Sequence, residues 1–160
     1  MNDWSNFFAA MAESAATLTG LIFVGVSINL ARILSTKALP DRALESLILL
    51  LNILIISAHS LVPHRTIGFI GYEILFTASI TWGILIYLDT RILRNTEKSQ
   101  KRYAIQNAIF SQLATLPYIL GGIMILCQGF DGIYYIIPGI IISFIKAIID
   151  AWVLLVEIHR

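Results

Sequence analysis

Among the side chains that can carry charge inside long apolar runs of this sequence, five are candidates for chemistry: Glu13, His59, Glu73, Lys146 and Asp150. An ionised side chain at the centre of a bilayer costs about 2.5–3.5 kcal/mol on insertion scales, so such residues are rare unless they are paired or hydrated. Carboxylates along a hydrated path attract cations or relay protons, and an imidazole titrates near neutral pH. These residue types therefore predict either a path for a cation or proton, or internal ion pairs.

Glu13 and Glu73 lie at similar depths in two different apolar segments. Each is about six residues, or about 9 Å, from the start of its segment, and His59 approaches the same level from the far end of another. Since no cation lies at this level in the sequence, either water meets both carboxylates in a vestibule open to the outside, or burial keeps them neutral. In the first case Glu13 and Glu73 carry the ion, and His59 is a pH-sensitive neighbour.

Lys146 and Asp150 lie four residues apart near the middle of the last apolar segment. This spacing places opposite charges on one face of a helix, so we expect Lys146 to pair with Asp150 or with a carboxylate on a neighbouring helix. The pair would act as an internal clamp, or as a gate or counter-charge in an ion path. Glu45 lies close to a segment end, where we expect its side chain to reach the membrane surface and need no partner.

Other chemistry has little support in the sequence. It contains no H-E-x-x-H, G-x-S-x-G, Walker or G-x-G-x-x-G motif, so we expect no enzyme activity and no cofactor. His59 and His64 could join the outer carboxylates as metal ligands, but their spacing matches no zinc signature, and we predict no metal site. Cys127 is the only cysteine, which excludes an intrachain disulfide. The net charge of +1, without a basic cluster outside short loops, argues against nucleic acid as a partner.

The elements that must position these residues are strongly apolar. Of 160 residues, 58% are apolar and 13% are charged, against about 45–50% and about 25% in soluble domains. Mean hydropathy is +0.81. A helix needs about 20 residues to cross about 30 Å of hydrocarbon, and five apolar segments are close to this length. We therefore predict an all-α integral membrane bundle, a single transmembrane domain over residues 1–160, with five transmembrane helices at about residues 7–31, 42–62, 66–93, 103–127 and 133–158.

The distribution of cations predicts the orientation of the bundle in the membrane. Nine lysines and arginines lie in the loops and tail on one side, whereas Arg65 alone lies on the other. Because short loops rich in these residues stay in the cytoplasm, we expect the N-terminus outside and the C-terminus inside. The nine are Arg32, Lys37, Arg42, Arg91, Arg94, Lys98, Lys101, Arg102 and Arg160.

Small residues in the first segment indicate a helix contact. Ala12, Ala16 and Gly20 form a small-xxx-small ladder, which lets two helices approach closely. Five helices make a bundle with little room for a pore, whereas a ring of copies can enclose one, so we expect a homo-oligomer with this ladder as a candidate subunit contact.

The fourth segment contains a candidate hinge. Pro117 cannot donate a backbone hydrogen bond to residue 113, and Gly121 and Gly122 lower the resistance of a helix to bending. We expect a kink here. Such interruptions often mark ion sites in transporter helices, but they also occur in helices without such a role.

The first 65 residues carry a likeness to known proteins in three stretches: NFFAAMAESAATLTGLIFVGVSINL at residues 6–30, ALPDRALESLILLL at 38–51 and LVPHR at 61–65. These stretches resemble an uncharacterised family of small bacterial multi-spanning integral membrane proteins. The resemblance implies a multi-pass protein of the bacterial inner membrane. It assigns no site residues.

Taken together, these features favour an oligomeric inner-membrane protein that passes or gates a cation or proton, with the lipid bilayer and other copies of itself as partners. An alternative is a non-conducting scaffold or regulatory subunit that binds a larger membrane partner. A third is a lipid-binding protein that uses the bend at Pro117 as a lateral cleft.

Overall fold

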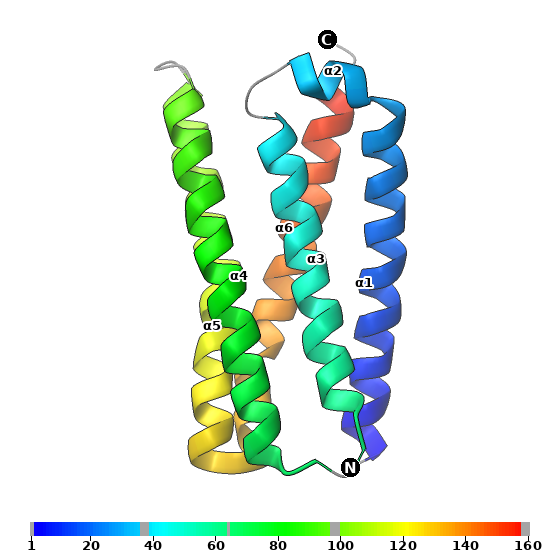
Figure 1. Cartoon of the computed structure of the whole chain (residues 1–160), viewed down its shortest axis with the longest axis vertical. Helices are drawn as coiled ribbons and strands as arrows, with labels where there is room; N and C mark the ends of the chain where they lie inside the picture. Colours follow the sequence, from blue (N-terminus) through cyan, green and yellow to red (C-terminus); the bar gives the residue numbers. More distant parts are fainter. Residues whose placement is uncertain (1, 36–38, 64, 97–99, 158–160) are drawn as a thin grey trace.

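The computed structural model describes residues 2–35, 39–63, 65–96 and 100–157. Within these ranges every regular element is helical and there is no strand, which confirms the predicted all-α class. The elements are α1 (Asn2–Ile28), α2 (Leu30–Ser35), α3 (Leu39–Leu61), α4 (Ile67–Asn95), α5 (Lys101–Gln128), the 3₁₀ segment η2 (Gly129–Tyr135) and α6 (Ile137–Glu157), as drawn in Figure 1.

Four helical stretches of the described chain are long and apolar enough to cross a membrane: Trp4–Ile28, Leu39–Leu61, Ile67–Asn95 and Lys101–Tyr135. In hydrocarbon a chain must satisfy its backbone polar groups internally, which an α-helix does within one segment. The structure therefore supports a multi-pass membrane protein.

The predicted ends of two segments are wrong. The first helix does not run to residue 31, because α1 ends at Ile28 and the short α2 follows. Ile33 of α2 packs with Leu39 and Ala43 of α3, so α2 folds back onto the start of the next long helix. The last helix does not begin at residue 133, because residues 129–135 form η2; Gly129, which has a φ of 70° that favours glycine, ends α5.

Several predicted features lie outside the described residues. They are the end of the last helix at residue 158 and the positions of His64, Lys37, Lys98 and Arg160.

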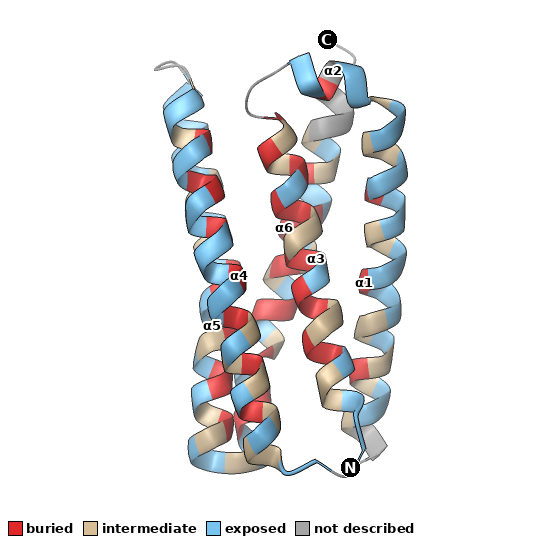
Figure 2. Ribbon diagram, in the orientation of Figure 1, coloured by how far each residue is buried: buried red, intermediate tan, exposed pale blue. Residues whose placement is uncertain are grey.

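The long helices run alternately up and down, with the two chain ends at opposite ends of the bundle (Figure 1). α3 packs against α1, α4 and α6, while α5 packs against α4, α6 and η2. The buried residues line the facing sides of these helices, and the outward sides are exposed (Figure 2). Because the outward sides carry large apolar residues such as Phe23, Phe76 and Ile145, they suit a lipid environment.

Two of the three candidate hinge residues, Gly121 and Gly122, serve helix packing. Pro117 lies inside α5, which continues as one helix to Gln128. Gly121 and Gly122 are both buried: a Cβ at Gly121 would meet the Ile136 side chain at 2.4 Å, and one at Gly122 would meet the Leu75 backbone nitrogen at 3.0 Å. The two glycines thus allow α5 to approach its neighbours closely.

The small-residue ladder of α1 faces away from the core of this chain. Ala12 is half-buried, whereas Ala16 and Gly20 are exposed. A Cβ at Gly20 would have no neighbour within 4 Å. The ladder is therefore not used for packing between helices of one chain.

We predict that Gly132→Ala destabilises the bundle by about 1–3 kcal/mol, the usual range for overpacking a core. A Cβ at Gly132 would lie 2.2 Å from the backbone nitrogen of Ile125, so backbone must move. Unfolding of the purified protein in detergent micelles measures the loss. Gly83→Ala is the control, because its Cβ enters open space. Equal stability of both variants with the wild type would contradict the close contact of η2 with α5.

Candidate functional site

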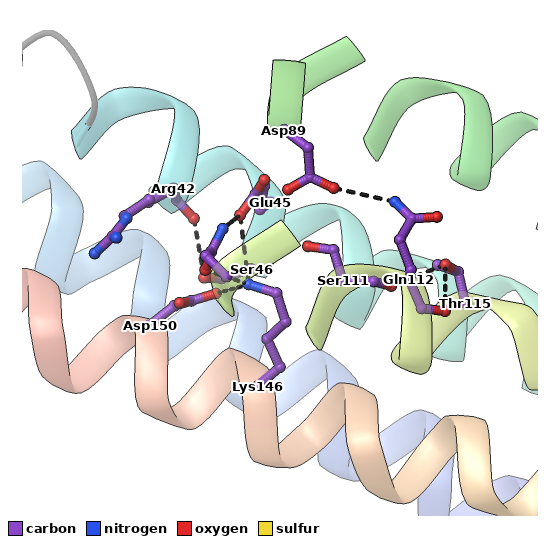
Figure 3. A network of polar contacts seen from close by, with 10 residues as sticks. Arg42, Glu45, Ser46, Asp89, Ser111, Gln112, Thr115, Lys146 and Asp150 are labelled. Carbon is purple, nitrogen blue, oxygen red and sulfur yellow. Dashed lines mark hydrogen bonds and ion pairs between the residues drawn. The ribbon is translucent and has the colours of Figure 1, made fainter. Parts of the chain in front are cut away.

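A buried network of polar side chains joins α3, α4, α5 and α6 (Figure 3). Its central group is Lys146 of α6, which is only 2% exposed. The Lys146 Nζ atom lies 2.6 Å from Asp150 Oδ2, 2.9 Å from Asn107 Oδ1 and 3.4 Å from Glu45 Oε2. An ammonium group has three N–H donors, so all three are used. Lys146 thereby connects its own helix to α3 and α5.

Asn107 joins the two charged partners from α5. Its Nδ2 donates to Glu45 Oε2 at 2.8 Å, while its Oδ1 accepts from Lys146. Glu45 itself is fully buried. One oxygen of the Glu45 carboxyl therefore receives two donors, which is the arrangement expected of a buried charge that water does not reach.

The network extends through Asp89 of α4, which is also buried. Gln112 Nε2 donates to Asp89 Oδ2 at 3.1 Å, and Gln112 Oε1 accepts from the Trp82 indole at 2.6 Å. The Asp89 carboxyl lies within hydrogen-bonding reach of the Glu45 carboxyl. Asp89 thus connects α4 to both α3 and α5.

Acids outnumber bases in this network. The three buried carboxyls of Glu45, Asp89 and Asp150 face the single ammonium of Lys146. The side chain of Arg42, although nearby on α3, points away from the group (Figure 3). If every member were ionised, the network would hold an excess negative charge in an apolar bundle, which is costly without a compensating cation or proton.

Polar contacts recur between α3 and α4 from Asp41 to Asn52. Asp41 pairs with Arg91 at 3.2 Å, Glu45 faces Asp89, and Thr81 Oγ1 donates to Asn52 Oδ1 at 3.0 Å. Successive α3 residues meet successively earlier α4 residues, as antiparallel helices require. These polar contacts therefore fix the relative height of these helices.

The ion pair predicted between Lys146 and Asp150 is confirmed. The alternative partner, a carboxylate on a neighbouring helix, is present as well, since Glu45 contacts the same ammonium. The expectation that Glu45 reaches the membrane surface without a partner is wrong. Burial by α5 and α6 holds its side chain inside.

The outer carboxylates occupy different surroundings. Arg65 forms an ion pair with Glu73, so a cation meets this carboxyl although none lies at its level in the sequence. The two groups lie eight residues apart, across the start of α4, and the Arg65 guanidinium also stacks 4.8 Å from the Phe69 ring centre. Glu13 is exposed on α1.

His59 is half-buried, and its Nδ1 has no hydrogen-bond partner. No hydrogen bond or ion pair described for residues 2–35, 39–63 and 65–96 joins Glu13, His59 and Glu73. The same ranges and residues 100–157 hold no group of three or more His, Cys, Asp and Glu side chains suited to a metal ion. The expected vestibule of these three residues therefore has no support in the contacts of this chain.

The sequence patterns did not predict four members of the network, which are Glu45 as a buried group, Asp89, Asn107 and Gln112. A signal was present on the third apolar segment, because Asp89 lies eight residues after Thr81 and so extends the same helical face. A second signal was the seven-residue spacing of Glu45 and Asn52 on the preceding segment. Reading both faces in antiparallel order would have paired Asn52 with Thr81 and Glu45 with Asp89.

Comparison of this chain with protein-family models, with curated proteins and with solved structures finds no match.

We predict that Lys146→Met lowers the free energy of unfolding by about 3–5 kcal/mol at neutral pH, because it leaves the buried Glu45 and Asp150 without their cation. Unfolding in detergent micelles measures the loss. Arg65→Met is the matched control: it breaks the partly exposed pair with Glu73, for which about 0–1 kcal/mol is expected. Similar losses in both variants would contradict the central place of Lys146.

Proposed function

We propose that this protein moves protons or other small cations across the bacterial inner membrane. The observation that supports this function is the buried excess of carboxyl groups over ammonium groups between α3 and α6. Ionisable residues at membrane depth are costly and are retained where they carry ions or relay protons. In this proposal the path includes Lys146 and Asp150, together with Glu45 and Asp89, in place of the outer carboxylates.

The proposed membrane topology has five crossings, with α6 as the fifth, the N-terminus outside and the C-terminus in the cytoplasm. The excess of lysine and arginine in the loops and tail on one side of the bundle supports this orientation. Glu45 lies six residues after the start of α3, and Asp89 six residues before the end of α4. The network then lies in the cytoplasmic half of the bilayer, about 9 Å inside these helix ends.

Two features bear on how ions would cross. The carboxyl network is buried within one chain, so each copy holds its own ion-binding groups. The ladder of Ala12, Ala16 and Gly20 faces outward, which suits contact with a second copy. We propose a homo-oligomer in which α1 lies at the subunit contact.

A second candidate function is that of a non-conducting scaffold or regulatory subunit. The observation that favours it is the complete use of the three Lys146 donors, because a fully paired ammonium also suits a static clamp. In this case the network stabilises the bundle and no ion crosses.

Proton flux into liposomes distinguishes the two functions. We expect wild-type protein to dissipate an imposed pH gradient, measured with a pH-sensitive dye inside the vesicles. Glu45→Gln keeps the shape of the side chain but cannot carry a proton, so its flux should fall to that of protein-free vesicles. Glu13→Gln changes an exposed carboxyl on α1 and should leave flux unchanged. A wild-type protein that leaves both proton and sodium gradients intact would favour the scaffold.

A further inference from the structure

Three buried oxygen atoms at the centre of the network lack a hydrogen-bond partner: Glu45 Oε1, Asp89 Oδ1 and Ser111 Oγ. The other oxygen of each carboxyl is occupied, Glu45 Oε2 by Asn107 and Lys146 and Asp89 Oδ2 by Gln112. Ser111 of α5 is fully buried, and its hydroxyl points toward the Asp89 carboxyl (Figure 3). Unpartnered oxygens from three helices thus converge at one place.

Two facing carboxyls cannot both be ionised there at low cost. Like charges in contact, away from water, repel strongly, and such pairs keep one proton between them. A buried oxygen without a donor costs about 1–3 kcal/mol, and more when it is charged. Protonation of one carboxyl removes both costs, because the added O–H donates to the facing oxygen.

No hydrogen bond of the described residues brings a donor to Glu45 Oε1 or Asp89 Oδ1. The three N–H groups of Lys146 are used, and the amides of Asn107 and Gln112 each donate one N–H to the other oxygen of these carboxyls, Glu45 Oε2 and Asp89 Oδ2. The Ser111 hydroxyl, which points toward this place, can serve one oxygen but not two. The hydrogen bonds of the described residues therefore leave at least one oxygen at this position without a donor.

The charged groups around the pair come from three helices. On α6, Lys146 faces both carboxyls and is itself paired with Asp150. On α3 and α4, Asp41 and Arg91 pair with each other nearer the helix ends, and the Arg42 side chain of α3 points away from the carboxyls. The Lys146–Asp150 pair has no net charge. It therefore does not offset the negative charge that Glu45 and Asp89 carry when both are ionised.

We propose that Glu45 and Asp89 bind a single proton between Oε1 and Oδ1, with the Ser111 hydroxyl as a third ligand. The site takes up one proton and releases one, while Lys146 and Asp150 stay ionised. This inference deepens the proposed function, since it identifies the transported ion as a proton and the Glu45–Asp89 pair as its carrier. Three free oxygens are too few for Ca²⁺, which takes six to eight.

Infrared spectroscopy of the full-length protein in lipid vesicles tests the site. We expect the carbonyl stretch of a protonated carboxylic acid at neutral pH, shifted in heavy water and by isotope labelling of the aspartate and glutamate carboxyl carbons. Glu45→Gln and Asp89→Asn should each remove this band completely, because either change ends the repulsion that holds the proton. Ser111→Ala should shift the band without removing it. Glu13→Gln, at an exposed carboxyl, should change nothing.

Three results would overturn the proposal. One is the absence of the band in wild-type protein at neutral pH. Another is a band that each single substitution lowers only in part, since that describes two independent acids. The last is loss of the band on addition of sodium ions, which assigns the site to a metal cation. Failure of the transport function is distinguishable, because an intact band in a protein without flux leaves the proton site in place.

Discussion

The fold depends on neutralising one ammonium group within an apolar bundle. Lys146 is buried away from water, so each of its N–H groups must donate to an oxygen of the protein. Asp150 supplies one from the same helix, but the other two come from α3 and α5 through Glu45 and Asn107. Because helices in a bilayer gain little from apolar contact with one another, these polar bonds have a large part in selecting which helices become neighbours.

Polar bonds set the height of α3 against α4, whereas both polar bonds and close packing act between α5 and its neighbours. Along α3 and α4 the contacts of Asp41 with Arg91 and of Asn52 with Thr81 set the relative height. Along α5 the buried glycines also set the relative height, because Gly122 leaves room for the backbone of α4 and Gly121 leaves room for Ile136, just before α6. The network lies where the two sets of constraints meet. A shift of α5 along its axis would therefore disturb Asn107 and Gln112 as well as the glycine contacts.

The sequence predicted those features that depend on a single segment. Apolar runs of membrane-spanning length identified four helical stretches that the structure describes, and the four-residue spacing of Lys146 and Asp150 identified their ion pair. Features that depend on neighbours were not predictable in this way. Glu45 lies near a helix end, where an isolated helix would expose it, and only the packing of α5 and α6 buries it. Arg65 reaches Glu73 because the chain turns before α4.

The composition of the network bears on the choice between the proposed ion site and a simple clamp. A clamp needs equal numbers of opposite charges, and buried ion pairs can often be replaced by apolar residues without loss of stability. Asp89 adds a third carboxyl beside Glu45, where it repels the very group that neutralises Lys146. Such a contact lowers stability unless a proton accompanies it. A buried acid that needs a proton to be tolerated is also one that can give the proton up, and this property favours transport over scaffolding.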